Sequence, residues 1–371
     1  MQRKTLITAA VAAAALATAG TMSTATATAA RSGSAPHRSV VTKNLFSPLS
    51  FAVRSNGTAY IAQNFIGQLL EKKPGEPSTL VFQAKGGSAE GPNEVGAVSV
   101  RNGVVTFAVT SATGGVIKQA TKTDGKWVIK TIADVGAFEK TQNPDAGSTY
   151  GFESIPDECA AQIDPAVSGP PTYTGIIDAH PYGTASTADT IYVADAAANA
   201  ILEIDGQGTV SELTVLPVVP AVVTAEAAAS AGFPDCTIGL TYDFEPVPTD
   251  VEVGSDGSLY VSSLPGGPED GSAGALGAVY RVHPQSGHAT KVVSGLISAT
   301  GVAVAPNGDL YVSELFAGQI AKIPAGADEA QPFRSFPLPA AVELQGGQLY
   351  ATVNALPSDG PPAGRLVKLG L

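Results

Sequence analysis

The chain has 371 residues, of which 21 are basic and 33 acidic, and a formal net charge of −12 at pH 7. No cluster of lysine or arginine offsets this charge locally, so nucleic acid and membrane surfaces are not expected as partners. The 41 glycines, 27 prolines and 44% hydrophobic residues exclude a disordered chain and indicate a turn-rich globular domain.

The first 30 residues are typical of an export signal. Arg3 and Lys4 precede an apolar run over residues 6–19, and small residues with Ala-x-Ala spacing follow it. A transmembrane anchor is the alternative, but the apolar run is short for one, so we expect cleavage. We therefore predict a signal peptide over residues 1–30, a flexible leader over residues 31–39 and a secreted protein.

A short pattern then returns six times. Each copy has an apolar strand, a tight turn, a strand centred on an aromatic residue, and a glycine or asparagine that opens a third strand; residues 301–323 hold the clearest copy. Asn-Gly and Asp-Gly turns, which allow the positive φ angles of tight hairpins, precede most of the aromatic residues. The third copy lacks such a turn over residues 182–189, so a longer hairpin is expected there. The aromatic residues are Tyr60, Phe107, Tyr192, Tyr260, Tyr311 and Tyr350.

Candidate fourth strands follow five of these units, over residues 78–83, 126–132, 209–213, 289–293 and 332–336. None follows the sixth unit, and residues 40–43, ahead of the first unit, are predicted to complete it. A single unit cannot bury its own apolar faces, so the units must stack. We predict an all-β fold: a six-bladed β-propeller of four-stranded antiparallel blades, closed by the N-terminal strand, as one domain over residues 40–371. A β-sandwich or an open solenoid is the alternative.

Long connections are predicted to lie on one face of this propeller. If the strands of a blade are lettered a to d from the axis outward, the b–c loops and the d–a crossings share one face. The long segments all belong to these two classes, and they cover residues 86–94, 141–179, 217–249, 265–275 and 354–362. Loops on a rigid scaffold often carry recognition, so this face is the predicted working surface, with neutral insertions as the alternative.

Two cysteines, Cys159 and Cys236, lie in two of these crossings. In an exported protein an even pair usually forms a disulfide, so a bridge is predicted, with two buried thiols as the alternative. The bridge would tie two long loops together on the predicted working face.

Three segments carry a family resemblance: residues 178–183 (Asp-Ala-His-Pro-Tyr-Gly), residues 192–202 and residues 247–251. They resemble the ScyD/ScyE family of exported β-propeller proteins, and residues 192–202 are also similar to NHL-repeat and gluconolactonase-like propellers. The resemblance covers about residues 40–371 and implies the propeller fold. It implies no activity, because the biochemical role of the ScyD/ScyE family is not established.

Polar residues are predicted to surround the mouth of the axial tunnel as ligand-binding residues. Carboxylate and amide oxygens in such a ring could hold Ca²⁺, as the resemblance to gluconolactonase-like propellers implies; no cofactor is otherwise expected. Asp195 and Asn199 could instead cap backbone N–H groups of their own loop. The ring comprises Asn64, Glu94, Asp178, His180, Tyr182, Asp195, Asn199, Asp250, Glu314 and Asn354.

His180 is the candidate catalytic residue, as a general base beside Asp178 and Tyr182, and an ordinary surface histidine is the alternative. The sequence contains no Gly-x-Ser-x-Gly, His-Glu-x-x-His, Cys-x-x-Cys or phosphate-loop motif. We therefore predict a monomeric secreted binding protein for a small molecule, a polysaccharide or a protein. The alternative is a Ca²⁺-assisted lactonase or lyase that uses His180 together with Asp178, Asp195 and Asp250.

Overall fold

The computed structural model describes residues 38–88, 91–268 and 271–371. The predicted signal peptide and all but the last two residues of the predicted leader lie outside the described residues. Within the described residues, none of the helices is long and apolar enough to cross a membrane.

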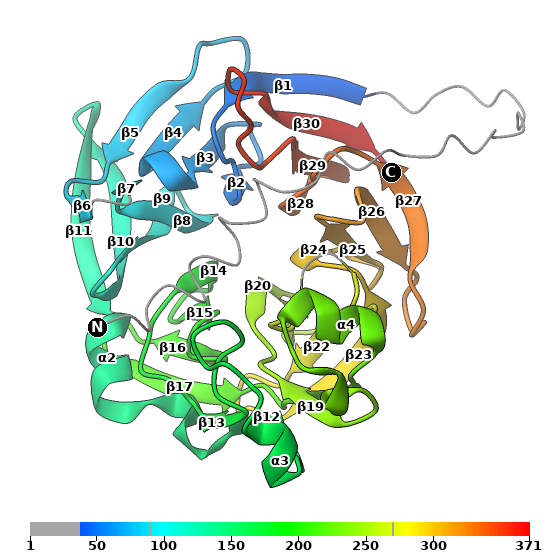
Figure 1. The fold of residues 1–371 in the computed structure, drawn as a ribbon. Helices are drawn as coiled ribbons and strands as arrows, with labels where there is room; N and C mark the ends of the chain where they lie inside the picture. Colours follow the sequence, from blue (N-terminus) through cyan, green and yellow to red (C-terminus); the bar gives the residue numbers. More distant parts are fainter. Residues whose placement is uncertain (1–37, 89–90, 269–270) are drawn as a thin grey trace, which may run out of the picture.

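Six four-stranded antiparallel sheets follow one another around a ring (Figure 1). We call them blades 1 to 6 in chain order. Blade 1 contains β2 (Phe51–Val53), β3 (Ala59–Gln63), β4 (Gln68–Lys72) and β5 (Thr79–Gln83), and blade 2 contains β8 (Glu94–Arg101), β9 (Val104–Ser111), β10 (Gly114–Thr123) and β11 (Lys126–Asp134). Blade 3 contains β14 (Pro181–Ser186), β15 (Ile191–Asp195), β16 (Ala200–Ile204) and β17 (Val210–Val215).

The second half of the ring repeats this arrangement. Blade 4 contains β20 (Pro248–Val253), β21 (Leu259–Ser263), β22 (Gly277–Val282) and β23 (Ala289–Leu296), and blade 5 contains β24 (Ala299–Val304), β25 (Leu310–Glu314), β26 (Gln319–Ile323) and β27 (Gln331–Ser335). Blade 6 contains β28 (Val342–Gln345), β29 (Gln348–Val353), β30 (Gly364–Gly370) and β1 (Arg38–Leu45). The inner strands contact one another in the order β2, β8, β14, β20, β24 and β28, and β28 contacts β2 again.

The N-terminal strand closes the ring. β1 pairs with β30 in antiparallel register, with Val40 opposite Val367 and Lys43 opposite Arg365, and it forms the outer strand of blade 6. The first and last parts of the chain therefore share one sheet, so the ring has no open end. The predicted fold class, an all-β propeller of four-stranded antiparallel sheets closed by the N-terminal strand, is confirmed.

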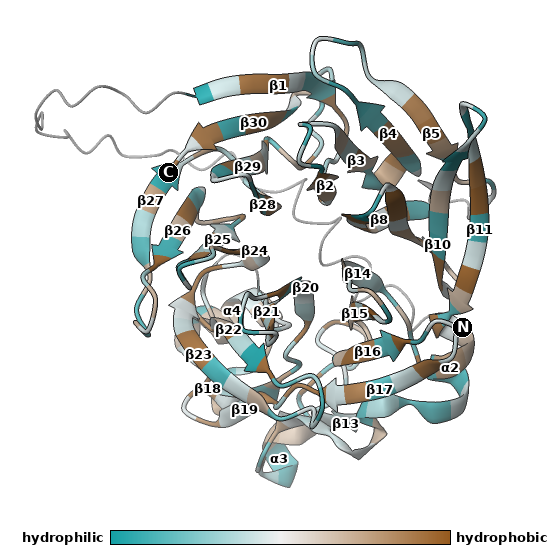
Figure 2. Cartoon of the chain, turned by 180° about the vertical axis from the view of Figure 1, so that it is seen from behind, coloured by the Kyte–Doolittle hydropathy of each residue, from teal (hydrophilic) through white to brown (hydrophobic). Residues whose placement is uncertain are grey.

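The sequence pattern explains the packing. The aromatic residue at the centre of each second strand is buried in five of the six blades, as for Tyr60 and Phe107, and Tyr260 is partly buried. Along outer strands such as β11, hydrophobic and hydrophilic residues alternate (Figure 2). This alternation is expected where one face of a strand packs on its own blade and its other face meets solvent.

The predicted long hairpin in blade 3 is wrong. β14 runs through Ser186, and only a short turn from Thr187 to Thr190 leads into β15. The Thr187 backbone N–H donates to the Thr190 carbonyl at 2.8 Å, and the Thr190 N–H donates to the Thr187 hydroxyl oxygen at 3.0 Å. A threonine side chain thus closes this turn in place of the Asn-Gly pair.

The two longest crossings form a seventh four-stranded sheet that the sequence analysis did not predict. We call residues 143–179 and 217–247 the cap. Its sheet has the order β13 (Thr172–Thr174), β12 (Thr149–Phe152), β19 (Thr241–Phe244) and β18 (Val219–Val222). The cap lies beside blades 3 and 4, on the side of the ring that faces the viewer in Figure 1. Its short helices are α3 (Asp157–Ala160), α4 (Ala225–Ala231) and the 3₁₀ helices η2 (Pro144–Gly147) and η3 (Asp235–Thr237).

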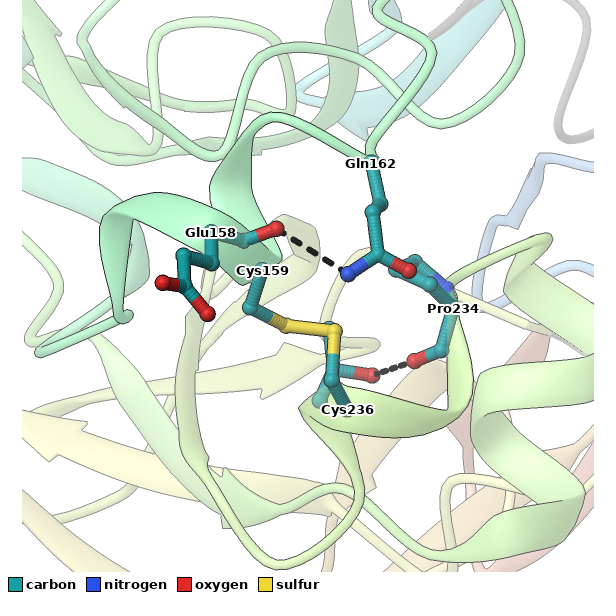
Figure 3. The surroundings of a disulfide bond; sticks show 6 residues. Glu158, Cys159, Gln162, Pro234 and Cys236 are labelled. Atoms are coloured by element: carbon teal, nitrogen blue, oxygen red, sulfur yellow. Dashed lines mark hydrogen bonds between the residues drawn. A yellow bond between two sulfur atoms is a disulfide. The ribbon is translucent and has the colours of Figure 1, made fainter.

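The cap has its own core and its own crosslink. Phe152, Phe233 and Tyr242 pack edge-on or tilted, with ring centroids 4.9 to 5.5 Å apart. Cys159 in α3 and Cys236 in η3 form a disulfide across 77 residues of sequence (Figure 3). The predicted disulfide is confirmed, and it joins the two halves of the cap.

Three smaller elements complete the described chain. Helix α2 (Val135–Gln142) leads from blade 2 to the cap, and its N-terminus is capped by Asp134, whose carboxylate accepts from the Ala137 N–H at 2.8 Å. The 3₁₀ helix η1 (Asn64–Ile66) connects β3 with β4, and a two-stranded ribbon of β6 (Gly87–Ser88) and β7 (Gly91–Pro92) lies between blades 1 and 2.

Candidate functional site

Several of the predicted site residues meet where β14 begins. The His180 backbone N–H donates to the Asp195 carboxylate at 2.7 Å, which fixes the position of His180 beside the end of β15. The His180 Nε2 lies 3.7 Å from Glu94 Oε2, and both side chains are partly exposed. The ring of Tyr182 lies 6.0 Å from the His180 ring, between centroids. We call Glu94, His180 and Tyr182 the mouth residues.

Tyr182 also lines a polar cavity on the ring axis, so the mouth residues and the cavity form one continuous site. Residues of all six inner strands or of the segments just before them contribute to the cavity wall. The lining residues are Leu49, Ser50, Phe51, Val98, Tyr182, Thr184, Thr249, Asp250, Glu252, Thr300, Ala341, Val342 and Glu343.

The ionisable lining of this axial channel is acidic, apart from the Tyr182 phenol. Asp250 and Glu252 come from β20, Glu343 comes from β28, and no lysine, arginine or histidine is among the lining residues. Burial raises the pKa of Asp250. Burial, and then the charge of Asp250, raises the pKa of Glu252; the pKa of Glu343 is raised by burial and by the charges of both other carboxyls. The three groups therefore repel one another when ionised.

Glu252 and Glu343 were missed by the sequence analysis, although the repeat contains a signal for them. Each lies opposite the aromatic residue of the next strand, Glu252 facing Tyr260 and Glu343 facing Tyr350. Aligning the repeats on their aromatic residues would have revealed this exchange. The same position is alanine in blades 1, 3 and 5, where Ala52, Ala185 and Ala303 face Tyr60, Tyr192 and Tyr311.

Other predicted site residues lie apart from the mouth and hold backbone groups. Asn64 Oδ1 accepts from the Leu49 N–H at 3.3 Å, and Glu314 Oε1 accepts from the Ile297 N–H at 2.7 Å. The backbone of Asn354 adopts a positive φ of 49° and its N–H donates to a carbonyl at 2.7 Å. These contacts fix loops at the starts and ends of the blades.

Asp250 combines both roles. Its two carboxylate oxygens accept from the N–H groups of Val251 and Val302, at 2.9 and 3.0 Å, so it joins blade 4 to blade 5. It also belongs to the channel wall. The carboxylate is therefore held in place by the scaffold while part of it lines the cavity.

Asp195 and Asn199 take part in a buried junction between the ring and the cap. Asp195 also accepts from the N–H groups of its own loop, as the capping alternative predicted. Asn199 Nδ2 donates to Asp145 Oδ2 at 2.9 Å, and the Tyr150 hydroxyl donates to the same oxygen at 3.0 Å. Asn199 Oδ1 accepts from the Val247 N–H at 3.1 Å. Asn199 thus holds the first half of the cap through Asp145 and the end of its second half through Val247.

Three carboxyls of this junction region were missed by the sequence analysis: Glu139 in α2, Asp145 in η2 and Glu245 after β19. All three are buried. Burial raises the pKa of Asp145, and it raises the pKa of Glu245 to about 7, with the Asp145 charge as the second cause. No sequence motif marks these residues, because their burial depends on the docking of the cap on the ring.

The fold has counterparts among solved structures. No protein-family model matches the sequence, and no curated protein matches it. The PQQ-bound aldose sugar dehydrogenase from Streptomyces coelicolor is 14% identical and has a TM-score of 0.57, with 91% of this chain and 99% of that chain covered. A putative oxidoreductase (glucose dehydrogenase) from Thermus thermophilus is 13% identical, with a TM-score of 0.53 and coverage of 90% of this chain and 99% of that chain.

A luciferin-regenerating enzyme is 12% identical, with a TM-score of 0.50 and coverage of 91% of this chain and 95% of that chain. The chain is a β-propeller. At these identities the likeness concerns the fold alone, so the chemistry of the propeller must be argued from its own residues.

Metal ligation is not preformed in the part of the propeller that the structure describes. Among those residues, no group of three or more His, Cys, Asp or Glu side chains has an arrangement that could hold a metal ion. What the site offers is a rigid acidic channel with a histidine, a glutamate and a tyrosine at one end.

Proposed function

We propose that this propeller is a secreted, monomeric binding protein of the ScyD/ScyE type that takes a positively charged ligand group into its axial channel. The observation that carries the proposal is the channel wall, where Asp250, Glu252 and Glu343 stand without a basic residue among the lining side chains. A ligand ammonium or guanidinium group would supply the missing positive charge.

The chemistry of the channel favours an organic cation. The three carboxyls come from two blades on a rigid ring, so they are held apart without a ligand and need little rearrangement to bind one. Tyr182 adds an aromatic ring to the wall, and cations bind to aromatic faces. The mouth residues and the cap lie near one end of the channel, where they can contact the rest of a small molecule or of a peptide side chain.

Calorimetric titration with spermidine, a flexible organic cation, tests this proposal. We expect binding to the unmodified protein and a loss of about tenfold or more in affinity in the double variant Glu252→Gln/Glu343→Gln, since each lost charge contact contributes about 1 kcal/mol or more. The matched control, Glu226→Gln/Glu329→Gln, removes two exposed carboxylates and should bind like the unmodified protein. Equal weakening in both double variants, or no binding at all, would contradict the proposal.

The pH dependence of this binding has a defined sign. Because the pKa values of the channel carboxyls are raised, a cation must displace protons from them at neutral pH. Spermidine affinity should therefore increase as the pH rises from 6 to 8, and protons should be released on binding. Titrations in buffers of different ionisation enthalpy measure this release, and affinity that is independent of pH would argue against binding at these carboxyls.

A second candidate function, a lactonase or lyase, is favoured by one observation. His180 Nε2 lies 3.7 Å from Glu94 Oε2 beside the channel mouth, a pairing suited to general acid–base catalysis. A panel of lactones and esters tests it, with and without Ca²⁺. Turnover that is abolished by His180→Ala in a folded protein would replace the binding proposal with this one.

A further inference from the structure

Unsatisfied hydrogen-bond acceptors gather in the region where the cap meets the ring. In the described ranges, six buried side-chain polar atoms lack a hydrogen-bond partner, and five of them belong to Glu139, Asn143, Asp145 and Asp195. The five atoms are both carboxylate oxygens of Glu139, Asn143 Oδ1, Asp145 Oδ1 and Asp195 Oδ2. All are acceptors, so these residues share a shortage of donors.

These residues are deeply buried. Glu139 and Asp145 are 1% exposed and Asp195 is fully buried. Burying an ionised carboxylate without a donor or an opposite charge is costly, and several together repel one another. The region therefore needs a source of positive charge or of hydrogen-bond donors.

The charged groups around Glu139 come from three segments. Asp195 at the end of β15, Asp145 in η2 and Asp178 before β14 all act on it electrostatically. His180 acts on Asp195 from the channel side. The nearest base in sequence, Lys140, is turned away, since its Nζ donates to the Thr113 carbonyl at 2.8 Å. Within the described ranges, no basic side chain donates a hydrogen bond to the Glu139 carboxyl.

We propose that Glu139 is a protonated carboxylic acid at neutral pH, that its O–H supplies the donor this junction lacks, and that its ionisation loosens the cap and the segment before β14. A protonated carboxyl is the one state of these side chains that both removes a negative charge and adds a donor. The proposal goes beyond ligand binding, because it concerns how the cap is held on the ring.

The electrostatics agree with this assignment. Burial, followed by the charges of Asp195 and Asp145, raises the pKa of Glu139 to about 8. A carboxyl whose pKa is higher in the folded than in the unfolded protein stabilises the fold when protonated. This stabilisation is complete at acidic pH and is lost as the pH rises from the ordinary glutamate range to about 8.

The consequence reaches the channel mouth through Asp195. One oxygen of this carboxylate accepts from the His180 N–H, and the other has no partner in the described chain. When Glu139 ionises, repulsion acts on the residue that positions His180. The cap junction is therefore a pH-sensitive latch next to the ligand site.

Hydrogen exchange and thermal unfolding across pH 6 to 9 test the latch. After correction for intrinsic rates, amides of residues 175–180 should lose protection by about tenfold between pH 8 and pH 9, and the melting temperature should fall up to about pH 8. Glu139→Gln, which keeps a donor and carries no charge, should show neither change. Glu158→Gln, an exposed control in α3 of the cap, should behave like the unmodified protein.

Two further arms separate the latch from its competitors. Glu245→Gln isolates the other buried carboxyl near Asp145, and a pH response that disappears there but persists in Glu139→Gln would overturn the proposal. Recovery of protection at pH 9 on addition of Ca²⁺ would make the junction a cation site instead. If Glu139→Gln does not fold, infrared spectroscopy of the unmodified protein decides: a carboxylic-acid C=O band that disappears near pH 8 supports the proposal, and its absence at pH 7 overturns it.

Discussion

The ring and the cap are stabilised in different ways. The ring uses the same contact repeatedly: Thr249 and Thr300, at equivalent positions of blades 4 and 5, each donate to a carbonyl of the next blade, at 2.9 and 2.7 Å. The cap relies on contacts that occur once, such as the Cys159–Cys236 disulfide and the bond between Asn199 and Asp145. Damage to the ring should therefore spread through neighbouring blades, whereas damage to the cap should remain local.

Their acidic groups differ in the same way. In the ring, Glu252 and Glu343 line a cavity that a ligand can enter. At the cap junction, Glu139 and Asp145 are sealed from solvent, so a proton is the ligand that fits them. Similar carboxyls thus serve binding in one region and assembly in the other, according to their access to solvent.

Deletion of the closing strand should have the largest effect. Removing residues through Lys43 strips most of β1 from β30 and leaves the edge of blade 6 unpaired. We expect a loss of about 5 kcal/mol in the free energy of unfolding, since each of several ladder hydrogen bonds contributes about 1 kcal/mol and the new edge promotes aggregation. Urea unfolding measures the loss, and a deletion through His37 should leave stability unchanged. Equal behaviour of the two deletions would mean that β1 does not close the ring.

Removal of the disulfide should have a large but local effect. The double variant Cys159→Ser/Cys236→Ser frees a loop of 77 residues of sequence separation, for which the chain-entropy estimate is about 4 kcal/mol. Hydrogen exchange should increase in β12, β13, β18 and β19, while the strands of blades 1, 5 and 6 keep their protection. Loss of protection throughout the ring would show that the cap is part of the same cooperative unit. Thiol titration of the denatured, unreduced protein should find no free thiol.

Loss of one repeated contact should have the smallest effect. Thr249→Val removes the donor to the Ala299 carbonyl and the contact with the Ser262 hydroxyl, both of which are buried. We expect a loss of about 1 to 2 kcal/mol, because a buried acceptor remains unsatisfied. Thr79→Val, the same change at an exposed position of β5, is the control and should be neutral within about 0.5 kcal/mol. An equal loss in both variants would show that the contact between blades contributes nothing.

Much of the ring could be predicted because its information is local. The aromatic residues, the Asn-Gly and Asp-Gly turns and the alternating apolar residues specify each blade within about 50 residues, and repetition identifies the stacking. The closing strand followed from the missing partner of β30. The prediction failed at the blade 3 hairpin, where the hydroxyl of Thr187 closes the turn that a glycine closes elsewhere.

The candidate site was only partly predictable. His180, Glu94 and Tyr182 were identified from their loop positions, and the structure brings them together. Glu252 and Glu343 were missed because a glutamate on a strand normally indicates a solvent-facing position. Their repeat position, alanine in three other blades, is what marks them as unusual.

The sequence by itself determined the blades, their order and the cysteine pair, because these depend on patterns repeated within short stretches of chain. Only the tertiary structure decided the cap and the carboxyl groups beneath it. Gly151 pairs with Asp243 across a long stretch of intervening chain, and Glu139, Asp145 and Asp195 come from separate elements. Pairing between distant strands and burial of a charged group depend on which surfaces dock together, and that information has no period in the sequence.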